Sequence, residues 1–439
     1  MSTLRITNRI VVTAAALAVA ACAPEATVVE EVPLATASTF STTHYALQNR
    51  PDVRGRNGAV SGDHPLAAQA GLRILQEGGN ATDAVIAMAG VLAVVRPHMN
   101  GIGGDAFGIF YDGESGEITA LNASGRSGAV ATPEFFAAAG VSRIPGSGAL
   151  SVSVPGAVAG WVDAHERFGS MDFDYLLEPA IEYARGGFAI STRLAMDFEA
   201  QGGNLNDEGQ TLYLPDGAAP PVGTLLINSA LADSLETVGR EGKQGFYNGA
   251  IGSQLAAFIT EQGGHLRQQD FASHSSTWVE PVRGEYLGHS ILVMPPNTQG
   301  VAQLALMEMS KSHPVESMGH NSTEYLHTLI ELKKPAFADR DRWIGDPMLA
   351  EVPVEQLLDV DYLRERAGLV DTTRPAESVE PGFGDEIFSN TDQQRNDAGD
   401  TVYITAVDQW GNAVSWIQSN FAGFGSGLLE SETGILLHN

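Results

Sequence analysis

The 439-residue sequence contains a single cysteine, Cys22. One cysteine cannot form an internal disulfide bond or a thiolate metal cluster. The eleven histidines include no HExxH pair, and no two are spaced to share one helical face with a carboxylate. The sequence therefore predicts no metal site.

Basic residues are also scarce. The chain has 25 lysines and arginines against 53 aspartates and glutamates, a formal net charge of −28. Such a surface repels phosphate backbones, and no run of basic residues offsets the repulsion. We expect the protein not to bind nucleic acid.

The apolar run at residues 10–21, IVVTAAALAVAA, is too short to span a bilayer. Its length is typical of a secretory signal peptide, and it ends in VAAC, which resembles the bacterial lipobox. A plain secretory signal with a chance cysteine is the alternative. We expect residues 1–22 to be a lipoprotein signal peptide and Cys22 to be acylated.

Residues 23–45 are rich in Ala, Thr, Ser, Glu and Pro, a composition typical of a flexible tether. We therefore expect the mature protein to be an exported lipoprotein, located in the periplasm or at the outer membrane. Its lipid would be its only attachment to the membrane.

Two nucleotide-binding motifs and one hydrolase motif are missing. The stretch GIGGDA (101–106) fits a loose GxGxxG/A pattern, but a helical pattern precedes it and a strand pattern follows, the reverse of a dinucleotide site. No Lys-Ser/Thr follows the glycines, as a P-loop would require, and no GxSxG elbow occurs in the chain. The glycines are therefore interpreted as a tight turn.

Hydrophobic periodicity predicts helices and strands in layers, without a regular βαβ alternation. Asp63 is the expected cap of the first helix, and the second is apolar on nearly all sides. The expected helices cover 63–80, 81–97, 156–168, 175–186, 228–240, 248–263 and 323–338, and the expected strands 106–111, 117–122, 290–294, 401–407 and 413–419. This order favours a layered α/β sandwich over a doubly wound sheet.

The polar stretch SNTDQQRNDAGD (389–400) runs directly into a well-formed strand that begins with Thr401. An internal threonine is a poor nucleophile, whereas an N-terminal threonine carries its own base, an α-amine with a pKa of about 7.7–8.0. Cleavage before Thr401 would create that arrangement. The alternative is an ordinary strand threonine on a solvated face.

Several blocks of the sequence, in order, resemble the γ-glutamyltransferase family of proenzymes. The likeness runs from about Arg54 to Asn439. The matching blocks include HPLAAQAGLRILQEGGNATDAV (64–85), RPHMNGIGGDAFGIFYD (96–112), SVPGAVAGW (153–161), MPPNTQGVAQL (294–304), AFADRDRWIGDP (336–347) and GDTVYITAVDQWGNAVSWIQSNFAGFGSG (399–427). The resemblance implies an αββα fold of the N-terminal-nucleophile hydrolase type.

The resemblance also implies the site. It places the nucleophile at Thr401, self-cleavage between Asp400 and Thr401, a supporting hydroxyl at Ser419, and a substrate-binding arginine at Arg126. It implies that residues 46–400 form the large subunit and that residues 401–439 are the start of the small subunit. It implies no metal or organic cofactor. The implied substrates are γ-glutamyl amides, whose acyl group passes through Thr401 to water or to an amino acid.

Two departures from the family pattern leave alternatives open. Where γ-glutamyl-transferring members have Thr-x-Asn, this chain has Ser419, Asn420 and Phe421, which resembles a hydrolase- or acylase-like branch of the family. The alternative is therefore a related amide hydrolase that resembles glutaryl or cephalosporin acylases or oxamate amidohydrolases. The chain also ends at Asn439, before the family's oxyanion-hole glycines, so we expect it to be C-terminally truncated and inactive alone. A non-catalytic lipoprotein derived from the enzyme is the remaining alternative.

Overall fold

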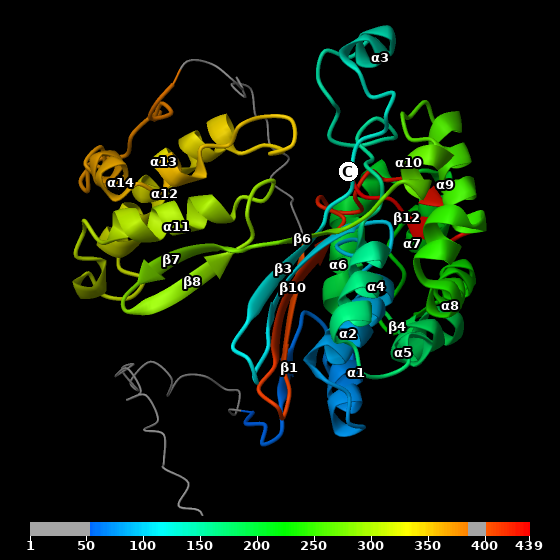
Figure 1. Cartoon of the computed structure of the whole chain (residues 1–439). Coiled ribbons are helices and arrows are strands. Elements are labelled where there is room, and N and C mark those ends of the chain that lie inside the picture. The colour runs from blue at the N-terminus through cyan, green and yellow to red at the C-terminus, as the bar shows by residue number, and fades with distance from the viewer. Residues whose placement is uncertain (1–52, 385–400) are drawn as a thin grey trace, which may run out of the picture. The chain divides into compact units, whose positions relative to one another are not determined.

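A six-stranded antiparallel sheet with the strand order β1-β9-β10-β2-β3-β6 organises the computed structural model (Figure 1). Residues 53–384 and 401–439 are described, so the predicted signal peptide, the tether and Asp400 lie outside. The strands are β1 (Ala59–Ser61), β2 (Asp105–Tyr111), β3 (Ile118–Ala123), β6 (Thr277–Val279), β9 (Val402–Val407) and β10 (Ala413–Ser419). The hairpin expected after Thr401 is confirmed and lies inside the sheet.

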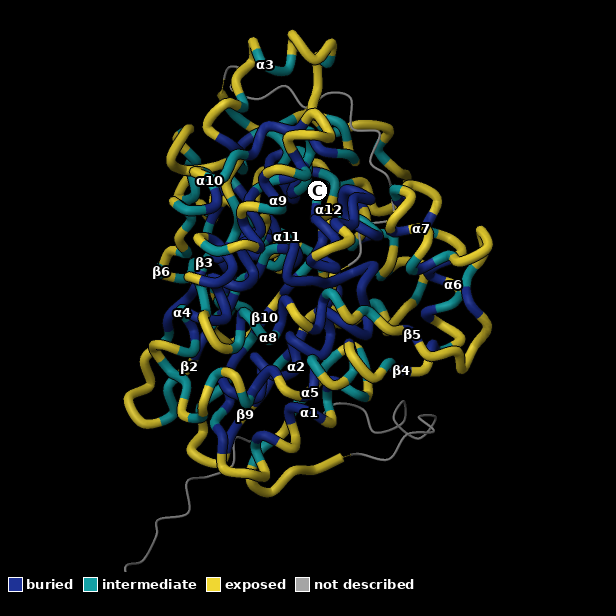
Figure 2. The backbone as a smooth tube through the Cα atoms, turned by 90° about the vertical axis from the view of Figure 1, so that its right-hand side faces the viewer, coloured by how far each residue is buried: buried dark blue, intermediate teal, exposed yellow. Residues whose placement is uncertain are grey.

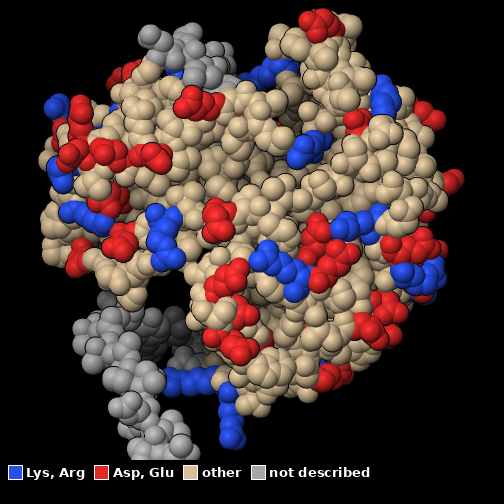
Figure 3. Space-filling view, viewed as in Figure 1, with Lys and Arg blue, Asp and Glu red and all other residues tan. Residues whose placement is uncertain are grey.

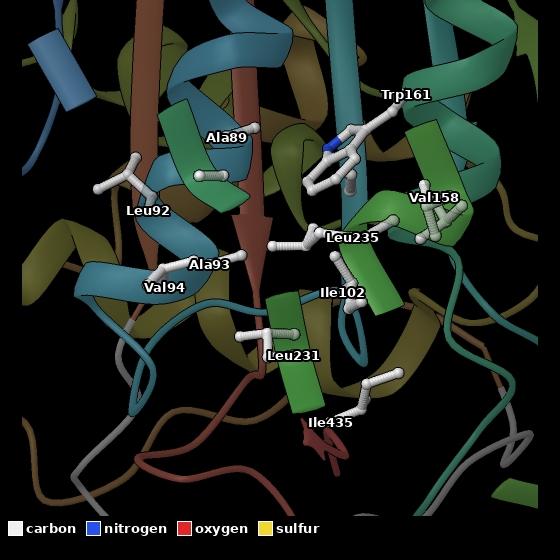
Figure 4. Packing of buried hydrophobic residues seen from close by; sticks show 14 of the residues in the cluster. Ala89, Leu92, Ala93, Val94, Ile102, Val158, Trp161, Leu231, Leu235 and Ile435 are labelled. Carbon is white, nitrogen blue, oxygen red and sulfur yellow. The ribbon is translucent and has the colours of Figure 1, made fainter. Parts of the chain in front are cut away.

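Helices cover one face of this sheet. α2 (Ala81–Val95) packs on β9 and β10, and every one of its residues is buried, as its uniformly apolar sequence predicts. Figure 4 shows Ala89, Leu92 and Ala93 of this helix in the buried cluster that also contains Trp161 and Leu235. The other helices of the layer are α1 (Pro65–Gln76), α4 (Ala157–Phe168), α5 (Phe173–Gly186) and α8 (Ser229–Lys243).

A second β layer comes from a hairpin in the middle of the chain. β7 (Val282–Tyr286) and β8 (His289–Val293) pair with each other and carry α11 (Gly300–Ser310), on which α12 (Thr323–Trp343) packs. α14 (Val360–Ala367) packs on α11 as well. Two β layers with their own helices form the layered α/β fold that the sequence predicts.

The remaining elements are mostly short, and many of their residues are exposed, whereas β11 and β12 are buried (Figure 2). They are α3 (Pro133–Ala138), α6 (Thr192–Gln201), α7 (Asp207–Tyr213), α9 (Ala250–Glu261), α10 (Gln268–Ala272), α13 (Val354–Leu357), β4 (Phe188–Ala189), β5 (Leu225–Leu226), β11 (Leu429–Glu430) and β12 (Ile435–Leu436).

The cap of the first helix differs from the expectation. His64, not Asp63, is the N-cap of α1, and its Nδ1 accepts the Leu66 N–H at 3.2 Å. Asp63 instead forms an ion pair with Arg96, whose Nε lies 2.8 Å from Oδ2. The prediction was wrong because Asp63 forms a tertiary ion pair instead of capping the helix. A local sequence pattern cannot reveal such a pair.

Candidate active site

Polar side chains lie in a row across one end of the six-stranded sheet. Ser419, the last residue of β10, is paired with Asp105, the first residue of β2. Thr401 immediately precedes β9, whose first residue pairs with Gln418, so Thr401 is level with Ser419. Ser124 directly follows β3 and completes the row. Antiparallel pairing thus brings together residues that are far apart in the sequence.

Thr401 and Ser419 are in direct contact. Their hydroxyl oxygens lie 2.9 Å apart, and either group can donate. The Ser419 oxygen also accepts the N–H of Phe421 at 2.7 Å, which fixes its position. Thr401 itself is exposed. An accessible hydroxyl held by a second, backbone-anchored hydroxyl is an arrangement suited to nucleophilic attack.

The glycine turn before β2 positions the end of β10. A Cβ on Gly104 would lie 2.3 Å from the carbonyl oxygen of Ser419, so no side chain fits there. Asn420 is fully buried beside the turn, donating its side-chain amide to the Pro97 carbonyl at 3.0 Å. The turn predicted from GIGGDA therefore exists, and its role is close packing against the strand that carries Ser419.

Phe421 occupies the position after this buried asparagine. Its side chain is 69% exposed, and its backbone φ is +75°, which is strained for a residue other than glycine. Because Asn420 is turned into the core, the side chain that faces the site here is an aromatic ring and not an amide.

A cavity of about 900 Å³ opens beside Thr401, between the two β layers. One wall is the outer face of the six-stranded sheet, and the other comes from β8, the start of α11, and α12. The residues lining it include Asp105, Phe107, Ser124, Met294, Asn297, Gln299, Gln303, Arg340, Asp341, Ile344, Thr401, Tyr403, Ile417, Ser419, Phe421 and His438. Arg340 donates to the side chains of Gln299 and Asp341.

Arg126 lies on the segment that follows β3, two residues beyond Ser124. Its side chain is exposed and does not line the cavity, and its carbonyl accepts the Val154 N–H at 2.9 Å. Burial, and then the nearby Arg126 charge, lower the pKa of His274 to about 4. Arg126 is therefore near His274, and the structure does not bring it into contact with Thr401.

Two residues that sequence patterns did not identify complete the site. Asp105 is largely buried, which raises the pKa of its carboxyl group. His438 and hydrogen bonds from Gly125, Gly156 and Ser124 oppose that shift. The Nδ1 of His438 lies 3.7 Å from Asp105 Oδ2, and its Nε2 lies 2.9 Å from the Ser153 carbonyl. Asp105 could have been noticed as a carboxylate inside a glycine turn, whereas nothing local marks His438.

Metal and membrane sites were also searched for in the described parts of the chain. Residues 53–384 and 401–439 contain no group of three or more His, Cys, Asp or Glu side chains placed to hold a metal ion. No helix within the same residues has both the length and the apolar character needed to cross a membrane.

Comparison with known proteins places this site in a family. Residues 67–439 match the family model described as gamma-glutamyltranspeptidase. The chain is 36% identical over 394 residues to the glutathione hydrolase-like YwrD proenzyme of Bacillus subtilis (strain 168), covering 88% of this chain and 71% of that protein. It is 33% identical over 407 residues to the acylase ACY 1 proenzyme of Pseudomonas sp. (strain SE83), covering 90% and 71%.

A solved structure gives the same result. The crystal structure of cephalosporin acylase from Bacillus halodurans superposes with a TM-score of 0.78 at 34% sequence identity, covering 89% of this chain and 71% of that one. The resemblance drawn from the sequence blocks is confirmed over nearly all of the residues it covers. The chain belongs to the gamma-glutamyltranspeptidase family.

Proposed function

We propose that this chain is a self-processing amide hydrolase and acyltransferase whose nucleophile is Thr401 and whose substrates are γ-glutamyl amides or closely related dicarboxylic acid monoamides. The observation that carries the proposal is the 2.9 Å contact between the Thr401 and Ser419 hydroxyls at the rim of a cavity. The relatives named as glutathione hydrolase-like and acylase proenzymes support the reaction class.

The first step of the proposed mechanism is cleavage of the chain itself. The Thr401 hydroxyl oxygen attacks the Asp400 carbonyl carbon, the Asp400–Thr401 C–N bond breaks, and an ester forms as the Thr401 nitrogen gains a proton. Water then hydrolyses the ester, leaving a carboxylate on Asp400 and a free amine on Thr401. The product is a large subunit that ends at Asp400 and a small subunit that begins at Thr401.

The second step uses the same hydroxyl on substrate. The free α-amine of Thr401 accepts the hydroxyl proton as the oxygen attacks the substrate amide carbon. The proton passes to the departing amine, and an acyl-enzyme ester remains. Water or an amino acid attacks that ester, which releases the acyl group and restores Thr401. Ser419 supports both steps by holding the nucleophilic oxygen in place.

Arg126 is proposed to bind the carboxylate at the far end of the acyl group. A guanidinium suits this role because its planar fork can make two parallel hydrogen bonds to one carboxylate. In the described structure Arg126 is exposed and lies two residues from the cavity wall at Ser124.

A second candidate is an acylase-like specificity for acyl groups without an α-amine, such as glutaryl or oxamate amides. Phe421 favours it, because an aromatic ring in the cavity offers no hydrogen bond to an amino group. Parallel assays of glutathione and a glutaryl amide on the processed protein distinguish the two. Preference for glutathione supports the first candidate, and preference for the glutaryl amide supports the second.

The test of the nucleophile is a set of three substitutions in the full-length precursor. Thr401→Ala should leave one uncut, inactive chain, because no hydroxyl remains. Thr401→Ser should still cleave, more slowly, and Ser419→Ala should slow both cleavage and turnover. Electrophoresis and N-terminal sequencing of the small fragment are the measurements. Cleavage that survives Thr401→Ala, or a fragment that starts at another residue, would contradict the assignment.

Wild-type protein that is never cut would instead support a non-catalytic lipoprotein.

The location of the protein is a separate proposal. We propose that the signal at 1–22 directs export, that Cys22 is acylated, and that the acyl chains attach the protein to a membrane that borders the periplasm. Cys22→Ala should abolish lipidation, and wild-type protein found entirely in the soluble periplasmic fraction would contradict the anchor.

A further inference from the structure

The carboxylate of Asp105 joins segments on both sides of the candidate active site. Its Oδ1 accepts the Gly125 N–H at 2.9 Å and the Gly156 N–H at 3.1 Å. Its Oδ2 accepts the Ser124 hydroxyl at 3.3 Å and faces His438. One largely buried side chain thus contacts the turn after β3, the start of α4, and the C-terminal segment.

Both glycines that donate to Asp105 are packed too tightly to carry a side chain. A Cβ on Gly125 would lie 1.6 Å from the Val154 carbonyl oxygen, and one on Gly156 would lie 2.0 Å from the Ala123 carbonyl oxygen. Because both residues are glycines, the backbone can come close enough for the two N–H groups to donate to the Asp105 carboxylate. Because glycine is the most flexible residue, these segments depend on an external contact to fix their position.

The segment fixed in this way ends in Arg126. Gly125 precedes Arg126, and the Arg126 carbonyl accepts the N–H of Val154, which precedes Gly156 by two residues. On the other side, Asp105 is paired with Ser419, whose hydroxyl contacts Thr401. Asp105 is therefore the shared link between the nucleophile row and the turn that carries the arginine.

We propose that Asp105, supported by His438, is a positioning residue that sets the separation between Arg126 and Thr401, and with it the length of the acyl group that the enzyme accepts. This proposal rests on the proposed function. The substrate class that follows is a monoamide of a dicarboxylic acid, with its free carboxylate at a fixed distance from the scissile amide.

A purely structural role is the competing explanation. α4 has no side-chain cap of its own, so the contact of Asp105 with Gly156 can be regarded as a helix cap supplied by β2. A cap alone would affect stability and would treat all substrates alike. A positioning role would raise the KM for substrates that carry a free carboxylate and would not raise it for substrates that lack one.

The experiment compares two amides with the same leaving group, one with a glutaryl and one with an uncharged butyryl acyl group. In Asp105→Ala, self-cleavage should persist, and the KM for the glutaryl amide should rise ~10- to 100-fold, because a small displacement of a binding group has effects of that order. Relative to the butyryl amide, the kcat/KM for the glutaryl amide should fall by a similar factor, whatever loss the two amides share. Asp105→Asn keeps the acceptor oxygen and should restore most of the glutaryl preference.

Asp112→Ala is the matched control, because Asp112 also accepts backbone N–H groups, from Glu114 and Ser115, but in an exposed turn. It should leave both KM values unchanged. Equal losses on both amides in Asp105→Ala, no loss on either, or an Asp105→Asn variant as impaired as Asp105→Ala would overturn the positioning role. Wild-type protein that hydrolyses neither of these amides nor glutathione would instead refute the proposed function.

Discussion

At the scale of single residues, the site depends on which side chains turn toward the cavity and which turn away. Asn420 and Phe421 are neighbours with opposite environments: the amide is fully buried, whereas the ring is 69% exposed. The buried amide serves the fold through its bond to Pro97, and the exposed ring lines the cavity. Substrate preference at this point should therefore be changeable without disturbing the core.

Phe421→Asn should move the specificity of the processed enzyme toward γ-glutamyl amides. An amide in the cavity can bond the α-amine of a γ-glutamyl group, and one such bond is worth ~0.5–1.5 kcal/mol, about 2- to 10-fold in relative kcat/KM. Stability should not fall, because asparagine tolerates the positive φ at this position better than phenylalanine. The kcat/KM ratio for glutathione over a glutaryl amide is the measurement.

Phe421→Gly is the control for this substitution. It relieves the same backbone strain and removes the same ring, but it supplies no amide. An identical specificity ratio in the asparagine and glycine variants would show that the amide has no effect.

Sequence reasoning reached some of these residues and missed others for identifiable physical reasons. The strand that follows Thr401 could be predicted from local alternation, whereas Ser419 was assigned only through the family resemblance. Asp105 and His438 could not be linked, because 333 positions separate them and only the packed fold brings them together. The sequence also did not indicate that Asn420 is buried, because its hydrogen-bond partner, the carbonyl of Pro97, is far away in the sequence.

At the scale of secondary-structure elements, a hydrogen bond to the side chain of Asp408 links the β9–β10 hairpin to the start of α2. Asp408 is buried, and its Oδ2 accepts the N–H of Ala81, the first residue of α2, at 3.0 Å. Its Oδ1 accepts the N–H groups of Trp410 and Asn412 within the hairpin turn. The contact joins the predicted small subunit to the first buried helix of the predicted large one.

Asp408→Ala should lower the free energy of unfolding by about 2–4 kcal/mol, because a buried helix N–H and two turn N–H groups lose their acceptor. Chemical denaturation of the full chain measures the loss. Asp112→Ala removes a comparable turn acceptor from an exposed hairpin and should cost about 1 kcal/mol or less. Equal costs for the two variants would mean that the bond to α2 contributes nothing.

At the scale of the whole molecule, the sheet order and the charge together determine how a cleaved chain would behave. Figure 3 shows acidic side chains spread over the visible face with basic ones among them, in keeping with the net charge of −28. Residues 401–439 contain three acidic residues and no lysine or arginine, so this part of the predicted small subunit is negatively charged, as is the predicted large subunit. Net charge therefore opposes their association, and packing must hold them together.

The two subunits should remain associated after cleavage before Thr401. β9 and β10 lie between β1 and β2 in the sheet, and all seven residues of β10 pair with β2. Trp416 and Leu437 are fully buried in the same core. Separation would expose this apolar surface and leave ladder N–H and C=O groups of both pieces without partners, at ~1–3 kcal/mol for each buried group.

Size-exclusion chromatography of the cleaved protein is the measurement, with the uncut Thr401→Ala chain as the reference. Both should elute at the same volume, and denaturing electrophoresis should reveal two pieces only in the cleaved sample. Salt at about 1 M screens charge repulsion and leaves apolar burial intact, so it should not release the small piece, whereas urea should. A small piece that elutes separately in native buffer would mean that the interior place of β9 and β10 does not hold the subunits together.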